Sequence, residues 1–416
     1  MREMKNSGAA WIGQIPINWK VDKLKYHLKR DEPRNSNVTE VLSLYREYGV
    51  IPKDSRDDNH NVTSEDTSKY KYVKPGNFVI NKMKAWQGSV AVSDYEGIVS
   101  PAYFVYKFTS EDFYKRYFHY LLRSCYKDEF MRLSGGVRVG QWDLPSDALD
   151  KVLVLLPPYD EQQSICNILD QFCAEIDTLT ADIQSQIDAL ELYKRSVVTE
   201  IVTKGLNPDA QTTDSGVQWI GKMPAHWKTI RGKYILQYLQ KPVKEDDGVI
   251  TCFRDGEVTL RTNRREDGFT MSDKEIGYQG IDVGDLIVHG MDGFAGSIGI
   301  SDSRGKASPV LNVLDSKQNK RYLMYYLRSM AYSDVFLAMA TGIRVRSCDL
   351  RWNKLAELFY PVPPLDEQEA IVKHIDDTLR KADEIIANKK QHLDTLNEYK
   401  KSVIYEYVTG KKEVVV

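Results

Sequence analysis

The feature that most constrains the fold of this 416-residue chain is an internal repeat. Residues 7–20 (SGAAWIGQIPINWK) return as residues 215–228 (SGVQWIGKMPAHWK), with eight of 14 positions identical at an offset of 208 residues. Shorter matches follow in the same order, among them Gly88-Ser89 with Gly296-Ser297 and, at an offset of 206, Pro157-Pro158 with Pro363-Pro364. Ordered matches at a nearly constant offset indicate two homologous halves. Between the matches the two halves diverge almost completely.

Each half begins with about 150 residues that mix short β-branched and aromatic runs with turn residues. Residues 70–80, 89–93 and 98–108 are typical of strands, and residues 114–133 are typical of a helix. A long helix is then predicted after Pro157-Pro158, with Asp160 as its N-cap and Gln163 completing a capping box. Apolar residues recur at alternating steps of three and four from Ile165 to Ile201, which indicates a coiled coil.

The sequence therefore predicts an α+β protein with two globular domains, residues 1–158 and 207–364. Two long antiparallel coiled-coil helices, residues 159–206 and 365–412, are expected to separate these domains with pseudo-two-fold symmetry. A helix of ~44 residues is ~65 Å long. The globular parts carry net charges of +4 and +2, whereas the first helical part carries −6, so different partners are expected for domains and helices.

Composition excludes several classes of protein. Five cysteines without C-x-x-C spacing fit a reducing cytosol and argue against a disulfide framework or a cysteine-rich zinc site. No apolar run approaches the ~18–20 residues that cross a bilayer, and the first residues lack the apolar core of an export signal. We expect a cytoplasmic protein that binds no metal and no membrane. No glycine-rich cofactor loop or nuclease carboxylate cluster is recognisable.

The W-I-G-x-x-P-x-x-W-K block and the P-P-x-x-E-Q motif before each long helix, both repeated after some 200 residues, resemble the specificity subunit of type I restriction–modification systems. The resemblance covers essentially the whole chain. It implies two target-recognition domains that each read half of a split double-stranded DNA sequence. It also implies helices that dock two methylation subunits, with restriction subunits joining the full complex. S-adenosylmethionine, ATP and Mg²⁺ would act on those partners, and this chain would have no catalytic residues.

Candidate DNA contacts of two kinds are found. Arg138 and Arg344 occupy matching glycine-flanked loops, with Arg346 beside the second; arginine can grip a phosphate or a guanine edge bidentately. Because both copies share them, phosphate positioning suits these arginines better than base discrimination. The alternative is a turn whose arginine pairs with an internal carboxylate. The second kind is divergent polar residues that follow a strand, which suit base reading; they are Lys82, Lys84 and Gln87.

Four arginines of the second domain form a basic stretch without a close counterpart in the first: Arg254, Arg261, Arg264 and Arg265. A solvated face explains them about equally well, just as a variable solvated loop would explain Lys82, Lys84 and Gln87. Late on the helices, two repeated pairs are candidates for binding partner subunits: Tyr193-Lys194 and Tyr399-Lys400. Packing of the two helices against each other explains these pairs nearly as well. Trp11, Trp19, Trp219 and Trp227 are expected in the core or at the domain–helix contact.

Two other functions remain open from the residues alone. The chain could be a coiled-coil scaffold that binds only proteins, or a stand-alone DNA methyltransferase or nuclease. Against the latter, Leu156-Pro157-Pro158-Tyr159 lacks the acidic or amide residue that begins the related motif of amino-methyltransferases. The sequence leaves the target nucleotides undetermined, and the isolated chain could self-associate through unfilled helix faces.

Overall fold

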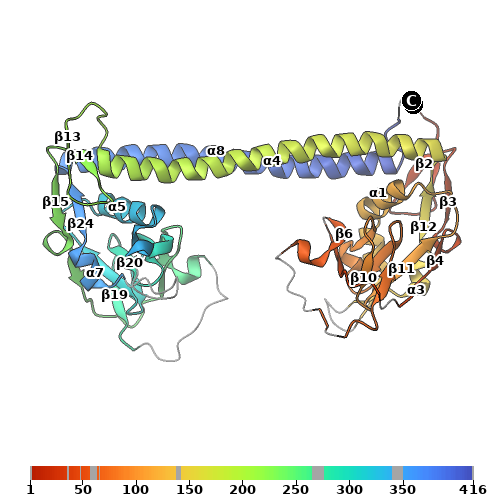
Figure 1. Ribbon diagram of the computed structural model, residues 1–416, viewed down its shortest axis with the longest axis horizontal. Coiled ribbons are helices and arrows are strands. Elements are labelled where there is room, and N and C mark those ends of the chain that lie inside the picture. The colour runs from red at the N-terminus through yellow and green to blue at the C-terminus, as the bar shows by residue number, and fades with distance from the viewer. Residues whose placement is uncertain are drawn as a thin grey trace. The chain divides into compact units, whose positions relative to one another are not determined.

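The computed structural model describes residues 2–34, 37–46, 48–56, 63–64, 66–136, 142–264, 276–339 and 350–414. The chain divides into two compact units (Figure 1). The first contains Met1–Ile183 and Gln391–Val416, and the second contains Gln184–Lys390. Both units include parts of two long helices, α4 (Tyr159–Lys204) and α8 (Leu365–Val408). The expected α+β class and the two long helices are confirmed.

The globular part of the first unit is built on a four-stranded antiparallel sheet of order β4-β11-β8-β9. Strand pairs β1–β2, β5–β6, β7–β10 and β3–β12 surround this sheet. The bounds are β1 Met4–Asn6, β2 Gln14–Pro16, β3 Lys20–Lys23, η1 Leu24–Tyr26, β4 Leu28–Arg30, β5 Leu42–Tyr45, β6 Gly49–Pro52, η2 Lys53–Ser55, β7 Lys71–Val73, β8 Phe78–Asn81, η3 Ala85–Gln87, β9 Val90–Val92, β10 Gly97–Val99, β11 Tyr103–Phe108, α1 Lys115–Cys125, α2 Lys127–Leu133, α3 Ser146–Leu149 and β12 Leu153–Leu156.

The second unit repeats this topology with the sheet order β16-β23-β20-β21. Its strand pairs are β13–β14, β17–β18, β19–β22 and β15–β24, in the same succession along the chain. The bounds are β13 Thr212–Asp214, β14 Lys222–Pro224, β15 Lys228–Arg231, η4 Gly232–Tyr234, β16 Gln237–Leu239, β17 Ile250–Cys252, β18 Val258–Leu260, η5 Arg261–Asn263, β19 Gln279–Ile281, β20 Leu286–His289, η6 Gly293–Ala295, β21 Ile298–Ile300, β22 Gly305–Ala307, β23 Leu311–Asp315, α5 Lys320–Tyr332, α6 Val335–Ala338, α7 Trp352–Glu357 and β24 Phe359–Val362.

Strand β8 lies at the centre of the first unit and is buried on both faces. Phe78 and Ile80 pack into the larger core with α1. Val79 points to the opposite face and joins a second core with residues of the β5–β6 hairpin, such as Leu44. Successive side chains of a strand point to opposite faces, so one apolar run can serve two cores. The hairpin is thereby fixed against the sheet.

Four local features differ from the sequence-based expectations. The strand expected over residues 98–108 divides into β10 and β11, which are separated by a turn. The strand expected over residues 70–80 is interrupted at Pro75-Gly76, because Gly76 has a φ of +83°. The helix expected over residues 114–133 divides into α1 and α2 at Tyr126, whose buried side chain donates a hydrogen bond to Leu153 O (2.8 Å). Helix α4 already includes Tyr159, so Asp160 lies in its first turn and is not the N-cap.

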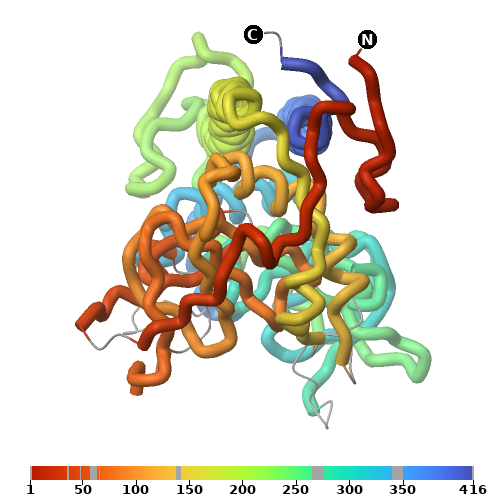
Figure 2. The backbone as a smooth tube through the Cα atoms, turned by 90° about the vertical axis from the view of Figure 1, so that its right-hand side faces the viewer, coloured from red at the N-terminus to blue at the C-terminus, as the bar shows by residue number. Residues whose placement is uncertain are grey.

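Within each unit the two long helices pack antiparallel, and Figure 2 shows them end-on and side by side. In the first unit Phe172 of α4 contacts the ring of Tyr399 of α8 (centroids 5.5 Å apart). In the second unit Lys194 of α4 binds Asp383 of α8 (2.6 Å). Apolar residues of both helices also enter the core of each globular part, for example Ile165 with Val403 and Val202 with Ile371.

Candidate nucleic-acid interface and domain–helix joints

In the first unit, the tip of the β5–β6 hairpin meets the loop that follows β8. Arg46 at the tip donates a hydrogen bond from Nη2 to Gln87 Oε1 of the loop (2.7 Å). Arg123 of α1 donates to Arg46 O and so ties the tip of the hairpin to α1. The exposed guanidinium of Arg46 and one of the predicted base-reading residues therefore share one surface.

The second unit contains the same arrangement between the β17–β18 hairpin and the loop after β20. Arg254 Nη2 donates to Asp292 Oδ1 (3.1 Å). The hairpin registers Leu42↔Pro52 and Ile250↔Leu260 place Arg254 208 residues after Arg46. Sequence comparison assigned Arg254 no counterpart, and this was wrong: Arg46 is its counterpart.

One side chain at the end of the preceding strand, buried Asn81 in the first unit and partly buried His289 in the second, hydrogen-bonds to the backbone of each loop. Asn81 Oδ1 accepts a hydrogen bond from Met83 N (3.1 Å), and His289 Nδ1 accepts from Met291 N (3.2 Å) and Asp292 N (2.9 Å). Burial lowers the pKa of His289 and so favours the neutral ring that can accept these bonds.

Met83 and Met291 are half-exposed on the two loops. Apolar contact with a thymine methyl group is one way in which such side chains read bases.

The structure brings together only some of the predicted contact residues. Lys82 Nζ is 3.0 Å from Asp143 Oδ2, whereas Lys84 is exposed beside Gln87. Arg264 binds Asp255 and Glu257 (2.6 and 3.0 Å) and lowers the pKa of Asp255, which favours a structural role in the hairpin. Arg261 Nε is 3.4 Å from Thr251 Oγ1. Four of the predicted arginines lie outside the described residues: Arg138, Arg265, Arg344 and Arg346.

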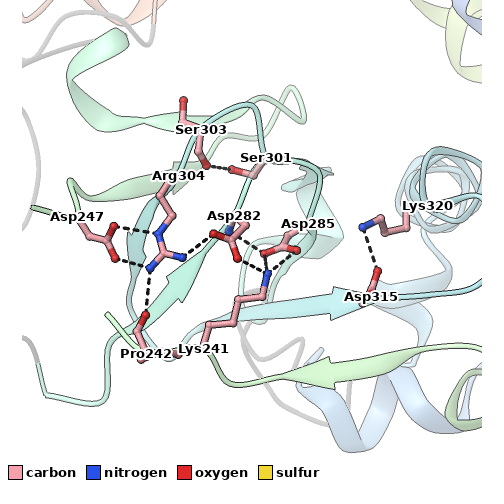
Figure 3. A network of polar contacts seen from close by, with 10 residues as sticks. All are labelled: Lys241, Pro242, Asp247, Asp282, Asp285, Ser301, Ser303, Arg304, Asp315 and Lys320. Atoms are coloured by element: carbon pink, nitrogen blue, oxygen red, sulfur yellow. Dashed lines mark hydrogen bonds and ion pairs between the residues drawn. The ribbon is translucent and has the colours of Figure 1, made fainter. Parts of the chain in front are cut away.

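An ion-pair network beside β19 and β22 occurs in the second unit (Figure 3). Arg304 binds Asp247 and Asp282 (2.9 and 2.5 Å), and Lys241 binds Asp282 and Asp285 (2.8 and 2.6 Å). Lys241 and Arg304 lower the pKa of Asp282 to about 2. The equivalent positions of the first unit, at an offset of 208, carry no such set of charges. Because its cations and carboxylates compensate one another, the network stabilises this part of the second unit and is poorly suited to bind DNA phosphates.

The repeated Glu-Gln pair at the start of each long helix joins that helix to its globular part. Trp19 Nε1 donates to Glu161 Oε2 and Trp227 Nε1 donates to Glu367 Oε1, both at 3.1 Å. The next residue in each copy, Gln162 or Gln368, is 0% exposed. The sequence shows these pairs only as part of a repeated motif, and their role as anchors was not predicted from it. The expected structural role of the tryptophans is confirmed.

Helices α1 and α5 carry a second joint, which sequence analysis missed. Their first ten residues, KRYFHYLLRS and KRYLMYYLRS, are identical at seven positions at an offset of 205 residues, so a comparison at that offset would have found them. Tyr117 donates from its hydroxyl to Val408 O, and Tyr322 donates to Val202 O, both at 3.0 Å. Each of these buried tyrosines thus holds the C-terminal end of the long helix that belongs to the other half of the sequence.

The same two helices bind the long helix that follows them in sequence. Arg116 Nε and Tyr120 Oη donate to Asp170 of α4 at 2.7 and 2.6 Å. In the second unit Arg321 and Tyr325 bind Asp376 of α8 in the same way. Burial and the neighbouring carboxylate raise the pKa of Tyr325 to about 12, which keeps its hydroxyl a donor. Each globular part is therefore fixed to both long helices.

The predicted partner-binding pairs divide into two kinds of side chain. Lys194 binds Asp383 and Lys400 binds Asp177, both at 2.6 Å, so contacts between the two helices account for the lysines. Tyr193 and Tyr399 remain half-exposed. The tyrosines therefore keep more exposed surface than the lysines, although one edge of the contact between the helices is formed by Tyr399, whose ring packs against Phe172.

His119 of α1 supports the hairpin side of the first unit, where its Nδ1 lies 3.3 Å from Val92 N. Burial lowers its pKa to about 4, so the unfolded chain, with a pKa near 6.5, takes up the proton first. Between about pH 6.5 and pH 4 the first unit should lose up to about 3 kcal/mol of unfolding free energy. His119→Met, which copies Met324 of the second unit, should remove this loss. Segment-resolved hydrogen exchange in urea at pH 7 and pH 4.5 measures the unfolding free energy of the first unit. If the wild type and His119→Met lose equal amounts of this free energy between the two pH values, the prediction is refuted.

Within the described ranges, no helix is long and apolar enough to cross a membrane. The same residues contain no group of three histidine, cysteine or carboxylate side chains arranged to hold a metal ion.

Comparison with known proteins gives consistent results. The family described as type I restriction modification DNA specificity domain matches residues 32–189. A candidate MjaX specificity subunit of a type I restriction enzyme from Methanocaldococcus jannaschii is 22% identical, covering 97% of this chain and 96% of its own. The StySPI specificity subunit from Salmonella potsdam is 20% identical over 70% of this chain and 64% of its own.

Solved structures share the fold at low sequence identity. The HsdS subunit from Thermoanaerobacter tengcongensis has a TM-score of 0.50 at 15% identity and covers 96% of this chain and 98% of its own. A chain from work on complex assembly and conformational transition of the type I R-M system has a TM-score of 0.66 at 14% identity, covering 96% and 99%. In its sequence matches, its duplicated halves and its long helices, the chain is similar over nearly its whole length to type I restriction–modification specificity subunits.

Proposed function

We propose that each globular part reads one half of a bipartite, asymmetric double-stranded DNA target. The observation that carries this proposal is the duplicated hairpin-and-loop surface. Arg46 and Arg254 occupy equivalent positions, yet they contact Gln87 in one unit and Asp292 in the other. The same backbone arrangement with different polar side chains suits two domains that recognise different DNA sequences. The major groove presents a distinct pattern of hydrogen-bond donors and acceptors for each base pair.

The long helices would dock two methylation subunits, and restriction subunits would complete the complex. The half-exposed rings of Tyr193 and Tyr399, at equivalent positions in the two halves, support this role. In this proposal the chain has no catalytic activity of its own. S-adenosylmethionine would serve adenine methylation on the methylation subunits, while ATP and Mg²⁺ would serve the restriction subunits.

Exchange of one reader tests the proposal. Replacing residues 20–150 by the corresponding segment of another specificity subunit should change one half-site of the methylated sequence and leave the other unchanged, because each unit has its own cores. Mapping methylated adenines in cells that carry the chain and its methylation subunit measures both half-sites. The reciprocal exchange of residues 228–356 is the control and should change only the other half-site. A change of both half-sites by one exchange would contradict modular reading.

Two competing functions give different results with the purified chain. A stand-alone methyltransferase or nuclease would modify or cut DNA when given S-adenosylmethionine or Mg²⁺ alone. A scaffold that binds only proteins would assemble with methylation subunits but show no sequence-selective retention of DNA. We expect neither result: turnover should require the partners, and retention by the complex should weaken with salt because phosphate contacts release counterions.

A further inference from the structure

A basic corner lies where β3 continues into η1 of the first unit. Leu24 N donates to Val152 O (2.8 Å) and Lys25 N donates to Asp150 O (3.2 Å), so η1 runs beside the segment before β12. Four exposed side chains define this basic corner: Lys23, Lys25, Tyr26 and Lys151. The pattern W-K-x-x-[K/R]-x-K-Y, residues 19–26, returns at residues 227–234. The repeat therefore extends well beyond the buried tryptophan, onto side chains that stabilise no core.

The equivalent corner of the second unit contains its own carboxylate. Arg231 Nη1 donates to Glu357 Oε2 (2.6 Å), and Lys233 Nζ donates to Glu357 Oε1 (2.9 Å). Gly232 N donates to Leu358 O, just as Leu24 N donates to Val152 O, which aligns Glu357 with Lys151. At these three positions the second unit has two cations and a carboxylate, whereas the first unit has three cations. Neighbouring like charges repel one another, so an anion bound at the basic corner would stabilise it.

Three carboxylates lie close to the basic corner in sequence or structure, those of Asp22, Asp147 and Asp150, and among the described residues only Asp147 forms an ion pair with one of its lysines. Asp147 Oδ2 is 3.9 Å from Lys151 Nζ, and both side chains are largely exposed, so this pair contributes little. Asp22 Oδ1 accepts the backbone N–H of Lys23 (2.7 Å). Tyr26 is 58% exposed and its counterpart Tyr234 is 74% exposed. Tyrosine hydroxyls, like lysines, are common donors to DNA phosphates.

We infer that the basic corner binds phosphates of the DNA duplex outside the half-site read by the hairpin and loop of the same unit. This inference rests on the proposed DNA-reading function. In the first unit β3 and β12 lie on one side and β6 of the hairpin lies on the other (Figure 1), so the basic corner meets a different stretch of DNA. The equivalent corner of the second unit, whose two cations are bound by Glu357, contributes much less to the affinity for these DNA phosphates.

The test uses the full chain in complex with its methylation subunit and a target duplex identified by methylation mapping. The duplex is prepared with flanks of ~20 bp, about two helical turns, and with the flanks removed. Lys151→Glu recreates the arrangement around Glu357 and should pair Lys23 and Lys25. The slope of log K against log salt should fall by about 2–3 on the flanked duplex, at ~0.9 per phosphate contact, and stay unchanged on the trimmed one. Lys233→Gln is the matched control in the second unit and should leave both slopes unchanged.

A triple variant, Lys23→Gln with Lys25→Gln and Lys151→Gln, should reproduce the loss without introducing a negative charge. Target preference over a scrambled duplex should be retained in every variant. Unchanged slopes with intact preference would overturn this inference and leave the proposed function standing. Impaired assembly with unchanged slopes would assign the basic corner to a protein partner and would overturn it too. A wild-type complex without any target preference would remove both proposals.

Discussion

Replacing Gln162 by leucine is expected to lower the unfolding free energy of the first unit by about 3 kcal/mol and to leave the second unit unchanged. The Gln162 amide is completely buried at the start of α4. It accepts from Tyr114 N (2.9 Å) and donates to Asp112 O (2.8 Å) and Pro157 O (3.0 Å). Leucine has a similar volume but leaves these three backbone groups without a partner, at about 1–3 kcal/mol for each group that stays buried.

The chain supplies two controls for this prediction. Gln163→Leu changes the adjacent, exposed glutamine in the same way and should alter stability by less than about 0.5 kcal/mol. Gln368→Leu removes the same contacts in the second unit, where Gln368 accepts from Asn319 N (2.9 Å) and donates to Pro363 O (2.8 Å). Hydrogen exchange in increasing urea, resolved by segment, assigns each loss to its unit. Equal effects of Gln162→Leu and Gln163→Leu would refute the anchoring role.

These anchors show where inference from sequence stops. The repeat, the α+β class and the two long helices follow from spacing and identity, which the sequence displays directly. Two of the three partners of Gln162, Tyr114 and Asp112, lie 48 and 50 residues earlier in the chain, and no local pattern reveals such contacts. The motif was found because it repeats, but its role depends on the tertiary fold.

The candidate DNA surface has a similar limit. Arg254 lies 208 residues after Arg46, at the offset of the repeat, but the identities around these arginines are too scattered to stand out, and the registers of the two hairpins establish the match. Recognition loops of such a duplicated protein must diverge if they are to read different bases, so the residues of greatest interest are those that self-comparison aligns least well. By contrast, the repeat in α1 and α5 was accessible at an offset of 205 residues and marks the joints, where both halves need the same contacts.

Lengthening both long helices is expected to lengthen the spacer between the half-sites by one or two base pairs. Four residues added after Ile183 in α4 and four after Lys390 in α8 fall at the boundary between the two units. Four residues extend a helix by ~6 Å and turn it by ~40° beyond one full turn. At 3.4 Å per base pair, the translation corresponds to ~2 bp, and the rotation corresponds to the twist of about one base pair. Methylation mapping reads the spacer directly.

The insertion must be made in both helices because each unit contains paired parts of α4 and α8. In the second unit Lys389 binds Gln186 Oε1 (2.5 Å) and Lys194 binds Asp383, so an insertion in one helix alone would require these pairs to shift or break. Exchanging the four residues before each insertion point for alanines, without adding any, keeps the length and should keep the spacer. If the lengthened protein still methylates DNA at the original spacing, the helices do not set the distance between the half-sites. The two readers would then have to be positioned by the methylation subunits.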